Sequence, residues 1–321
     1  MNLADSSPDF PSYHIANAHQ SALRSIARVV DERAPLQDPA QAAAAITAQL
    51  AAGNTLVLTG AGVSTDSGIP DYRGPTGTLG RHRPMTYQEF RYDADARQRY
   101  WARSFIGWSI MNRAEPNAAH HLLAGLEDRG HVSAIITQNV DGLHAAAGST
   151  NVIPIHGDLA TVACLDCGHR IARHNYAAAL AQANPGFTEA ARVSPDQVNP
   201  DGDVTLPTEL VAIFNQVPCP DCGSLALKPD VVYFGENVPE ERKYAAATAL
   251  ETADSLLVIG SSLAVMSGFK FVLDAQKQGK PVALINGGPT RADDRVPYRW
   301  RSKVIPALTI LDEALRHGAS I

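Results

Sequence analysis

A short apolar run followed at once by a glycine-rich turn constrains this chain most. Residues 55–74 read TLVLTGAGVSTDSGIPDYRG, which is a predicted strand, a turn and a polar segment. Gly60 and Gly62 follow the strand directly, and glycine permits a close approach of backbone N–H groups to a pyrophosphate. This order of strand and turn is typical of dinucleotide-binding α/β folds.

The usual fingerprint of such a turn, G-x-G-x-x-G, is incomplete here. Thr65 takes the third glycine position, and no acidic residue closes a second strand about 20 residues further on. Both differences disfavour a Rossmann dehydrogenase. An ordinary strand-to-helix turn would explain GAG alone, but SGIPDYRG adds a proline-stiffened turn with Asp71 and Arg73 beside the same expected phosphate site.

Strands and helices alternate along most of the chain. We predict strands at 55–59, 133–137, 255–260 and 281–286, and helices near 40–52, 86–110, 117–128, 240–252, 267–278 and 309–316. Strands separated by helices imply a parallel sheet covered on both faces. The expected fold class is therefore α/β, a Rossmann-like parallel sheet with helices on both faces, plus an inserted small zinc-binding domain.

The insertion is indicated by a change in composition. Cysteines, prolines and short polar pieces dominate from about residue 158 to 227. We therefore expect an N-terminal arm over 1–38 with a short helix within 19–34, an NAD-binding Rossmann-like domain over 39–157 and 228–321, and an inserted small domain over 158–227. A cleft between two such domains is a natural place for a binding site.

Charge and hydropathy exclude several classes of function. The formal net charge is −6, and the 27 basic residues are scattered among 33 acidic ones, so nucleic acid is not an expected ligand. No apolar stretch reaches the roughly 18–20 residues of a membrane helix, and the first residues lack the pattern of a secretory signal. We expect a soluble cytoplasmic protein that does not bind membranes.

The cysteines occur as two C-x-x-C pairs. Cys164 and Cys167 form CLDC, Cys219 and Cys222 form CPDC, and a glycine follows each pair. Four thiolates from two such turns can bind one structural zinc ion tetrahedrally, and in a reducing compartment such pairs bind metal more often than they form disulfides. Free thiols or a redox pair are the alternatives. The segment between the pairs, 168–218, is longer than a minimal zinc ribbon requires.

Polar side chains follow two further predicted strands. The segment TQNVDGLH (137–144) ends the strand at 133–137, and IHGD (155–158) ends the next one. Because ligands bind at the carboxyl ends of parallel strands, we expect Gln138, Asn139, Asp141 and His156 to converge near the nucleotide. A histidine with a pKa of about 6.5 can accept a hydroxyl proton at neutral pH, so His156 is a candidate general base.

Together these motifs resemble the sirtuin family of NAD-dependent protein deacylases. GAGVS (60–64) and GIPDYRG (68–74) match the family signature, with Tyr72 in place of a more frequent phenylalanine, and the resemblance covers residues 40 to 315. The stretches RQRYWARSF, NPDGDV, KPDVVYFGE and ADSLLVIGSSL look most like the class II branch, typified by the fourth animal sirtuin. The resemblance implies transfer of an acyl group from lysine to ADP-ribose, with release of nicotinamide.

The resemblance also implies roles for individual residues. His156 is the expected general base, and Asn139 and Asp141 orient the nicotinamide ribose and carboxamide. The small residues after the strands at 255–260 and 281–286 permit a close approach to the other end of NAD. The expected NAD-binding residues are Gly60, Ala61, Gly62, Ser64, Asp71, Tyr72, Arg73, Gln138, Asn139, Asp141, Gly260, Ser261, Ser262, Asn286, Gly287, Gly288 and Val304.

The expected substrate is an acylated lysine on a protein or peptide. Tyr100 and Arg103 lie three residues apart on a predicted helix, so they share a face. They match a Y-x-x-R pair with which some sirtuins bind acidic acyl groups, and arginine suits a carboxylate. Surface packing is the alternative for this pair. The segment 231–236, with Val232, Phe234 and Gly235, looks like a strand that pairs with the substrate backbone.

Two other functions remain compatible with these residues. A protein ADP-ribosyltransferase would share the nucleotide site, and a non-catalytic module could retain NAD and zinc without turnover. The intact His156, Asn139 and Asp141 disfavour the non-catalytic alternative.

Overall fold

A six-stranded parallel sheet forms the larger part of the computed structural model, which describes residues 10–74, 77, 79, 83–191, 193, 199 and 201–318. The strand order is β3-β2-β1-β7-β8-β9, and every pairing is parallel. The strands are β1 (Thr55–Thr59), β2 (Val132–Thr137), β3 (Val152–Pro154), β7 (Ser255–Ile259), β8 (Val282–Asn286) and β9 (Tyr298–Arg301). The strand order reverses between β1 and β7, the position where open α/β sheets bind ligands.

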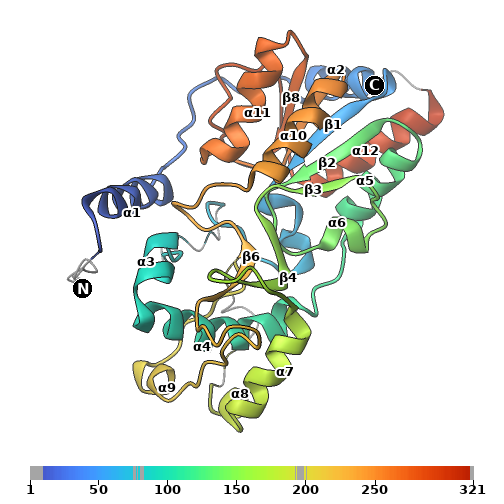
Figure 1. The fold of residues 1–321 in the computed structure, drawn as a ribbon. Helices are drawn as coiled ribbons and strands as arrows, with labels where there is room; N and C mark the ends of the chain where they lie inside the picture. Colours follow the sequence, from blue (N-terminus) through green and yellow to red (C-terminus); the bar gives the residue numbers. More distant parts are fainter. Residues whose placement is uncertain are drawn as a thin grey trace.

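Helices cover both faces of this sheet (Figure 1). One face holds α2 (Pro39–Ala51), α5 (Ala118–Asp128) and α12 (Val304–His317), and the other α10 (Glu240–Thr252) and α11 (Met266–Lys277). Alternate strand residues enter two cores: Val57 packs with the first group and Leu56 with the second. No helix among the described residues is long and apolar enough to cross a membrane. The expected Rossmann-like sheet is confirmed.

A second, three-stranded antiparallel sheet forms the smaller part. Its order is β5-β4-β6, with β4 (Gly157–Cys164), β5 (Arg170–Ala172) and β6 (Leu227–Val231). The short helices α7 (Arg173–Ala183), α8 (Phe187–Ala191) and α9 (Thr208–Ala212) accompany it, together with α3 (Tyr87–Tyr92) and α4 (Ala94–Met111). Trp101 of α4 is fully buried, and its indole N–H donates to the Leu227 carbonyl at 2.9 Å. Helix α4 therefore packs with the small sheet, although α4 comes before the strands of that sheet in the sequence. The expected bounds of the inserted domain, 158–227, stay a prediction.

Three element predictions need correction, and one strand was missed. The helix expected over 86–110 is two helices, because the Asp93 side chain accepts from the N–H groups of Asp95 and Ala96 and starts α4 anew. The last helix begins at Val304, not near 309, since Pro306 lies in its first turn, where a missing N–H is tolerated. Strand β9 was not expected. The expected strand at 231–236 is wrong, because β6 ends at Val231.

The N-terminal arm contains a helix that starts earlier than expected. Helix α1 spans Tyr13–Ile26, capped by Ser12, and it contacts α3. The buried His19 lies 2.9 Å from the Thr86 hydroxyl through its Nδ1 atom. Figure 1 shows α1 beside the junction of the two parts of the molecule. The arm is therefore a packed element over these residues.

Candidate active site

The glycine-rich turn packs directly on the turn that follows β7. After β1 the chain forms two short 3-10 helices, η1 (Ala61–Val63) and η2 (Thr65–Ser67). The Gly62 N–H donates to the Gly260 carbonyl at 2.9 Å. A Cβ atom on Gly62 would lie 2.9 Å from the Gly260 Cα, and one on Gly60 would lie 2.7 Å from the Ser261 Cβ. Glycine at both positions therefore allows the ends of β1 and β7 to meet.

Ser64 connects this turn to the end of β2. Its hydroxyl donates to Asp141 Oδ2 at 2.7 Å and accepts from Asn139 Nδ2 at 3.0 Å. Asn139 Nδ2 also donates to the Gly60 carbonyl at 3.2 Å, and Ser64 is fully buried. Asp141 accepts a further bond from the Leu143 N–H at the start of α6 (Leu143–Ala146). Asn139 and Asp141, which the strand ends predicted, are thus held in one hydrogen-bonded cluster with Ser64 of the signature GAGVS.

Two histidines beside this cluster were not expected from the sequence. His120 Nε2 lies 3.5 Å from the Ser64 hydroxyl, and its Nδ1 accepts from the Asn117 N–H at 3.2 Å. His144 lies against His120 with ring centroids 4.9 Å apart. Burial lowers the pKa of His144 to about 3 and also lowers the pKa of His120, so both rings are neutral at pH 7. The Asn117 side chain caps α5 in return, which fixes the His120 ring beside Ser64.

His156 lies just beyond β3 with both ring nitrogens engaged. Nδ1 is 3.0 Å from the Gln138 carbonyl, and Nε2 is 2.7 Å from the Ser267 hydroxyl. Since a carbonyl can only accept, Nδ1 carries the proton and Nε2 presents a lone pair. Burial lowers the pKa of His156, with the nearby Arg242 acting in the same direction and the Gln138 carbonyl opposing them. Ser267, in the first turn of α11, was not among the expected site residues.

Gln138 joins His156 to the turn after β7. Its side-chain oxygen accepts from the Ser261 hydroxyl at 2.6 Å, while its backbone carbonyl accepts from His156. A Cβ atom on Gly268 would lie 2.5 Å from Gln138 Nε2, so α11 can approach this amide only with glycine there. The ends of β2, β3 and β7 are therefore connected through one residue, Gln138.

The segment GIPDYRG turns from this cluster toward the N-terminal helix. The Arg73 guanidinium donates to the carbonyls of Ser25, Ile26 and Arg28 at 3.2–3.5 Å. The Asp71 side chain accepts from the Gly74 N–H at 2.8 Å. Burial raises the pKa of Tyr72 well above its usual range. Arg73 thus binds the C-terminal end of α1, which the sequence did not predict.

The expected adenosine-binding residues lie at the far end of the sheet. Asn286 ends β8, and its side chain donates to the Gly288 carbonyl at 2.8 Å. Gly287 lies between them, Ser262 follows β7, and Val304 begins α12. A small cavity here is lined by Leu36, Asn286 and Trp300, among others.

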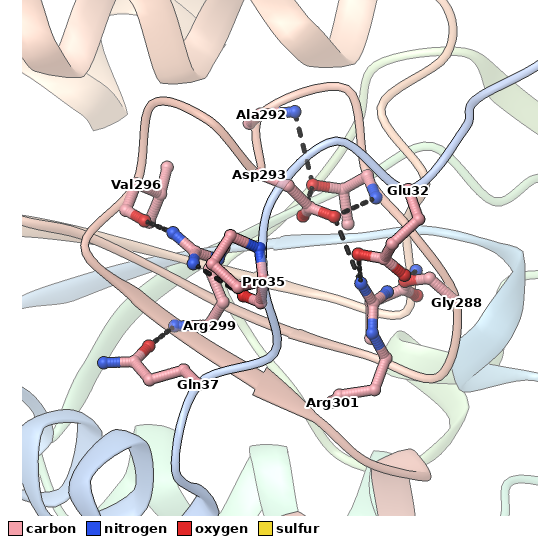
Figure 2. A network of polar contacts seen from close by, with 11 residues as sticks. Glu32, Pro35, Gln37, Gly288, Ala292, Asp293, Val296, Arg299 and Arg301 are labelled. Atoms are coloured by element: carbon pink, nitrogen blue, oxygen red, sulfur yellow. Dashed lines mark hydrogen bonds and ion pairs between the residues drawn. The ribbon is translucent and has the colours of Figure 1, made fainter.

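Residues 32–37 lie along this end of the sheet, as Figure 2 shows. Arg301 donates to Glu32 at 2.6 Å and to Asp293 at 3.2 Å. The Arg299 N–H donates to the Gln37 side chain at 2.7 Å. The N-terminal arm therefore borders the predicted nucleotide site near both Arg73 and Asn286.

The four cysteines form one cluster in the small part. All four sulfur atoms lie within 4.8 Å of one another, with Cys164 and Cys222 at 3.6 Å and Cys167 and Cys219 at 3.7 Å. A tetrahedron with Zn–S bonds of about 2.3 Å has S···S edges of about 3.8 Å, so the cluster fits zinc. Gly168 and Gly223, each with positive φ, close the two turns by bonding back to Cys164 and Cys219.

The expected substrate residues lie on α4 and on the segment that follows β6. Tyr100 is 4% exposed, and Arg103 Nε donates to the Val204 carbonyl at 2.5 Å and forms an ion pair with Asp203 at 3.3 Å. The Val232 N–H donates to the His156 carbonyl at 2.7 Å. Phe234 forms an isolated parallel bridge with Thr86 instead of belonging to a strand, and Gly235 follows it with positive φ.

The chemistry of the strand ends fits a dinucleotide. Carboxylate, amide and hydroxyl groups suit ribose hydroxyls and a carboxamide, and a Cβ atom on Gly288 would meet open space. A parallel sheet with such groups at its switch point, together with a cluster of four cysteines that fits zinc, defines a dinucleotide-binding α/β protein with a candidate zinc site. The model of the "Sir2 family" matches residues 60–267, more than half of the chain. The chain belongs to the Sir2 family, the sirtuins, as its motifs predicted.

Sequence and structure comparisons agree. NAD-dependent protein deacetylase 1 of Corynebacterium efficiens is 58% identical over 266 residues, covering 83% of this chain and 95% of the relative. NAD-dependent protein deacylase Sirt4 of Drosophila melanogaster is 46% identical over 261 residues, covering 79% of this chain and 82% of the relative. A Sir2 variant with deacetylated p53 peptide and 3′-O-acetyl-ADP-ribose has a TM-score of 0.65 at 28% identity, covering 84% and 96% of the two chains.

Proposed function

We propose that this protein is an NAD-dependent protein-lysine deacylase that transfers the acyl group of an acyl-lysine to ADP-ribose. The balanced reaction converts acyl-lysine, NAD and water into lysine, nicotinamide and O-acyl-ADP-ribose. The observation that carries the proposal is a neutral His156 at the sheet edge, bonded to the Gln138 carbonyl. Gln138 directly precedes Asn139, which forms a hydrogen-bonded cluster with Ser64 and Asp141. The printed names of the relatives support the same activity.

His156 acts as the general base in this proposal. Because the proton of His156 is on Nδ1, its Nε2 has a lone pair that can accept a proton from a ribose hydroxyl. In this structure the Ser267 hydroxyl donates to that lone pair. Burial lowers the pKa of His156, which keeps the ring neutral at pH 7. A neutral histidine within hydrogen-bond reach of a hydroxyl is the arrangement that general base catalysis requires.

Asn139 and Asp141 position the nucleotide. Ser64 holds both side chains, so their orientation is set before a ligand binds. Such preorganisation can supply several kcal/mol of the barrier reduction by orientation alone, on the order of 7 kcal/mol in favourable cases. Ser64 is therefore a positioning residue, and His120 supports it from the other side.

NAD supplies an electrophilic ribose carbon and a nicotinamide leaving group when it is bound. The residues that would hold it are those at the ends of β1, β2, β7 and β8. Zinc would be held by the four cysteines, at the end of β4 and in the turn before β6. That site lies in the small part and supplies stability to it, with no part in the reaction.

Acylated-lysine proteins or peptides are the proposed partners. A peptide can add to exposed backbone with little reading of its side chains, and the segment from Val232 to Gly235 borders both His156 and α3. A cytoplasmic location is part of the proposal. It is supported by the clustering of the two C-x-x-C pairs, because in a reducing compartment such pairs bind metal more often than they form disulfides.

The variant His156→Ala tests the proposal. Because the ring acts on the reaction and not on the Ser64 cluster, the variant should bind NAD with an affinity close to that of the wild type. Deacylation should fall by about 100-fold or more, the usual contribution of a general base. Calorimetric NAD titration and peptide mass spectrometry give the two readouts. Unchanged deacylation would remove His156 from the mechanism, while ADP-ribosyl transfer to protein without lysine release would favour the transferase.

A further inference from the structure

A poorly exposed ion pair joins the two parts of the molecule close to His156. Arg242 lies in the first turn of α10, whose Ala246 and Leu250 pack in a core of the large sheet. Its Nη2 atom lies 2.5 Å from the carboxylate of Asp230 in β6, a strand of the small sheet. The side chains of Arg242 and Asp230 are only 14% and 15% exposed. The pair therefore connects the large part to the small part away from bulk water.

The backbone that follows His156 is fitted to this pair. Gly157 has a φ of +83°, and a Cβ atom there would lie 1.8 Å from the Asp230 carbonyl oxygen and 2.6 Å from Arg242 Nη1. Gly157 also pairs with Val231 where β4 and β6 meet. Only glycine lets the guanidinium and the β6 backbone come this close to the residue after His156.

The same strand leads into the segment proposed to bind the peptide. The Val232 N–H donates to the His156 carbonyl at 2.7 Å, two residues beyond Asp230. A shift of β6 would therefore move this segment relative to the base. Arg242 holds β6 at Asp230 through the carboxylate and, at 3.5 Å, through the backbone carbonyl.

A second arginine shares the carboxylate of Asp230. Arg170 of β5 lies 2.7 Å from Asp230 Oδ2, but its side chain is 56% exposed. Arg242 is the arginine that acts on His156, where its charge opposes protonation of the ring. Asp230 therefore offsets part of the positive charge that Arg242 places beside the base.

The other groups around His156 are neutral, paired or on its own strand. The end of β2 and the start of α11 present a carbonyl and a hydroxyl to the ring, and neither carries a charge. Lys228 of β6 and Glu236 of the segment after it form an ion pair at 3.2 Å. Asp158 lies two residues further along, in β4. Among the described residues, Arg242 is the charged group that acts on the pKa of His156.

We propose that Arg242 and Asp230 are positioning residues of the reaction: the pair fixes β6 against the backbone of His156 and sets the charge beside the imidazole. The inference rests on the proposed deacylase function, in which His156 is the general base. It adds two residues that were not among the expected site residues. A base and a peptide segment held in fixed relation are what productive orientation of an acyl-lysine requires.

Replacing the two members should move the acidic limb of the pH profile in opposite directions. Arg242→Met removes a positive charge and so raises the pKa of His156, and kcat/KM should fall at a pH about half a unit higher than in the wild type. Asp230→Asn leaves Arg242 without its carboxylate, so the limb should move about half a unit lower. Shifts of the same sign, or no shift, would overturn the proposal.

Two further variants are the controls. Arg242→Lys keeps the positive charge, so its limb should stay at the wild-type pH. Lys243→Met removes the same charge from the next residue of α10, where Lys243 pairs with Glu240 on the surface at 2.7 Å. It should also leave the limb in place. A limb moved equally by Lys243→Met would mean that net charge and not the position of Arg242 is responsible, which would overturn the assignment.

The orientation of the base has its own readout. At about pH 8, where His156 is neutral in each variant, kcat should be about fivefold lower in Arg242→Met and in Asp230→Asn, because β6 is no longer fixed to α10. Arg242→Lys should recover most of this loss. Calorimetric titration should show the wild-type affinity for NAD, since the cluster at Ser64 is unchanged. A wild-type kcat in both charge-removing variants would overturn the orientation role.

Failure of this inference and failure of the proposed function give different results. The titration of the His156 ring can be followed by NMR without turnover, with His156→Gln to assign its signals. Absence of deacylation by the wild type, with opposite shifts of the ring titration in the two variants, would overturn the proposed function and leave the role of the pair standing. Deacylation with the same acidic limb in every variant would overturn the inference alone. Should Arg242→Met fail to fold, the nearly isosteric Asp230→Asn decides by the sign of its shift.

Discussion

At the scale of single residues, the account depends on the protonation state of His156. Nδ1 donates to a backbone carbonyl and Nε2 accepts from Ser267, which together define one neutral tautomer. The ring is also buried, and burial penalises the charged imidazolium. The two hydrogen bonds orient the ring and burial keeps it neutral, so Nε2 can act as a base.

This arrangement predicts the pH dependence of deacylation. Burial lowers the pKa of His156, so protonation requires a lower pH than for an exposed histidine. The base works only when neutral, and kcat/KM should therefore be level around neutral pH and fall only below about pH 6.5. A profile from about pH 5 to about pH 8 checks this. An acidic limb centred above the ordinary histidine value would contradict the buried neutral ring.

Particular residues show how far the sequence predicted the site. Gln138, Asn139, Asp141 and His156 were predicted to converge because the carboxyl ends of parallel strands meet at one edge, and Ser64 was expected from the signature GAGVS. His120 and Ser267 were missed, since each comes from the first turn of a helix whose distance from the cluster depends on packing. The partners of Arg73 on α1 were likewise not evident from the segment GIPDYRG.

At the scale of elements, buried strands were easier to predict than edges. β1 is buried at every position and reads as one apolar run, whereas β9 reads YRWR and has only Trp300 buried. Charged residues are common on edge strands because they prevent association with other sheets. The segment YRWR of β9 therefore lacks the apolar run from which the central strands were predicted.

Helix α1 should support the nucleotide site. Its last carbonyls accept from Arg73, and Ala22 approaches Gly235 closely. A chain without residues 1–30 should show a KM for NAD raised about fivefold, corresponding to about 1 kcal/mol of lost orientation of Arg73. Tyr13→Ala, at an exposed position of the same helix, is the control. An unchanged KM for NAD in the shortened chain would mean that α1 packs against α3 without supporting the nucleotide site.

The cysteine cluster should bind one zinc ion that stabilises the small sheet. Removing the ion with a chelator should lower Tm by on the order of 10 °C. Cys222→Ser should lose zinc, while Asp221→Asn, in the same turn, should keep it because all four thiolates remain. Native mass spectrometry counts the metal. A full-length chain that is equally stable without zinc would contradict a structural role for the metal.

At the scale of the whole molecule, the site lies where separate parts meet. The large sheet contributes the ends of β1, β2 and β7, α4 and its neighbours contribute the buried rings of Phe90 and Tyr100, and α1 lies to one side against α3 (Figure 1). Neither sheet alone carries both the nucleotide residues and these rings. Catalysis should therefore be sensitive to the packing of α4 against the small sheet, which buries Trp101.

The most direct test of the central claim is the stoichiometry of the products. Purified protein is incubated with NAD and an acetyl-lysine peptide, and free lysine peptide, nicotinamide and O-acetyl-ADP-ribose are quantified by mass spectrometry. The account predicts equal amounts of all three products, because one NAD is consumed for each acyl group transferred. Release of nicotinamide without O-acetyl-ADP-ribose, or of lysine peptide without nicotinamide, would contradict it.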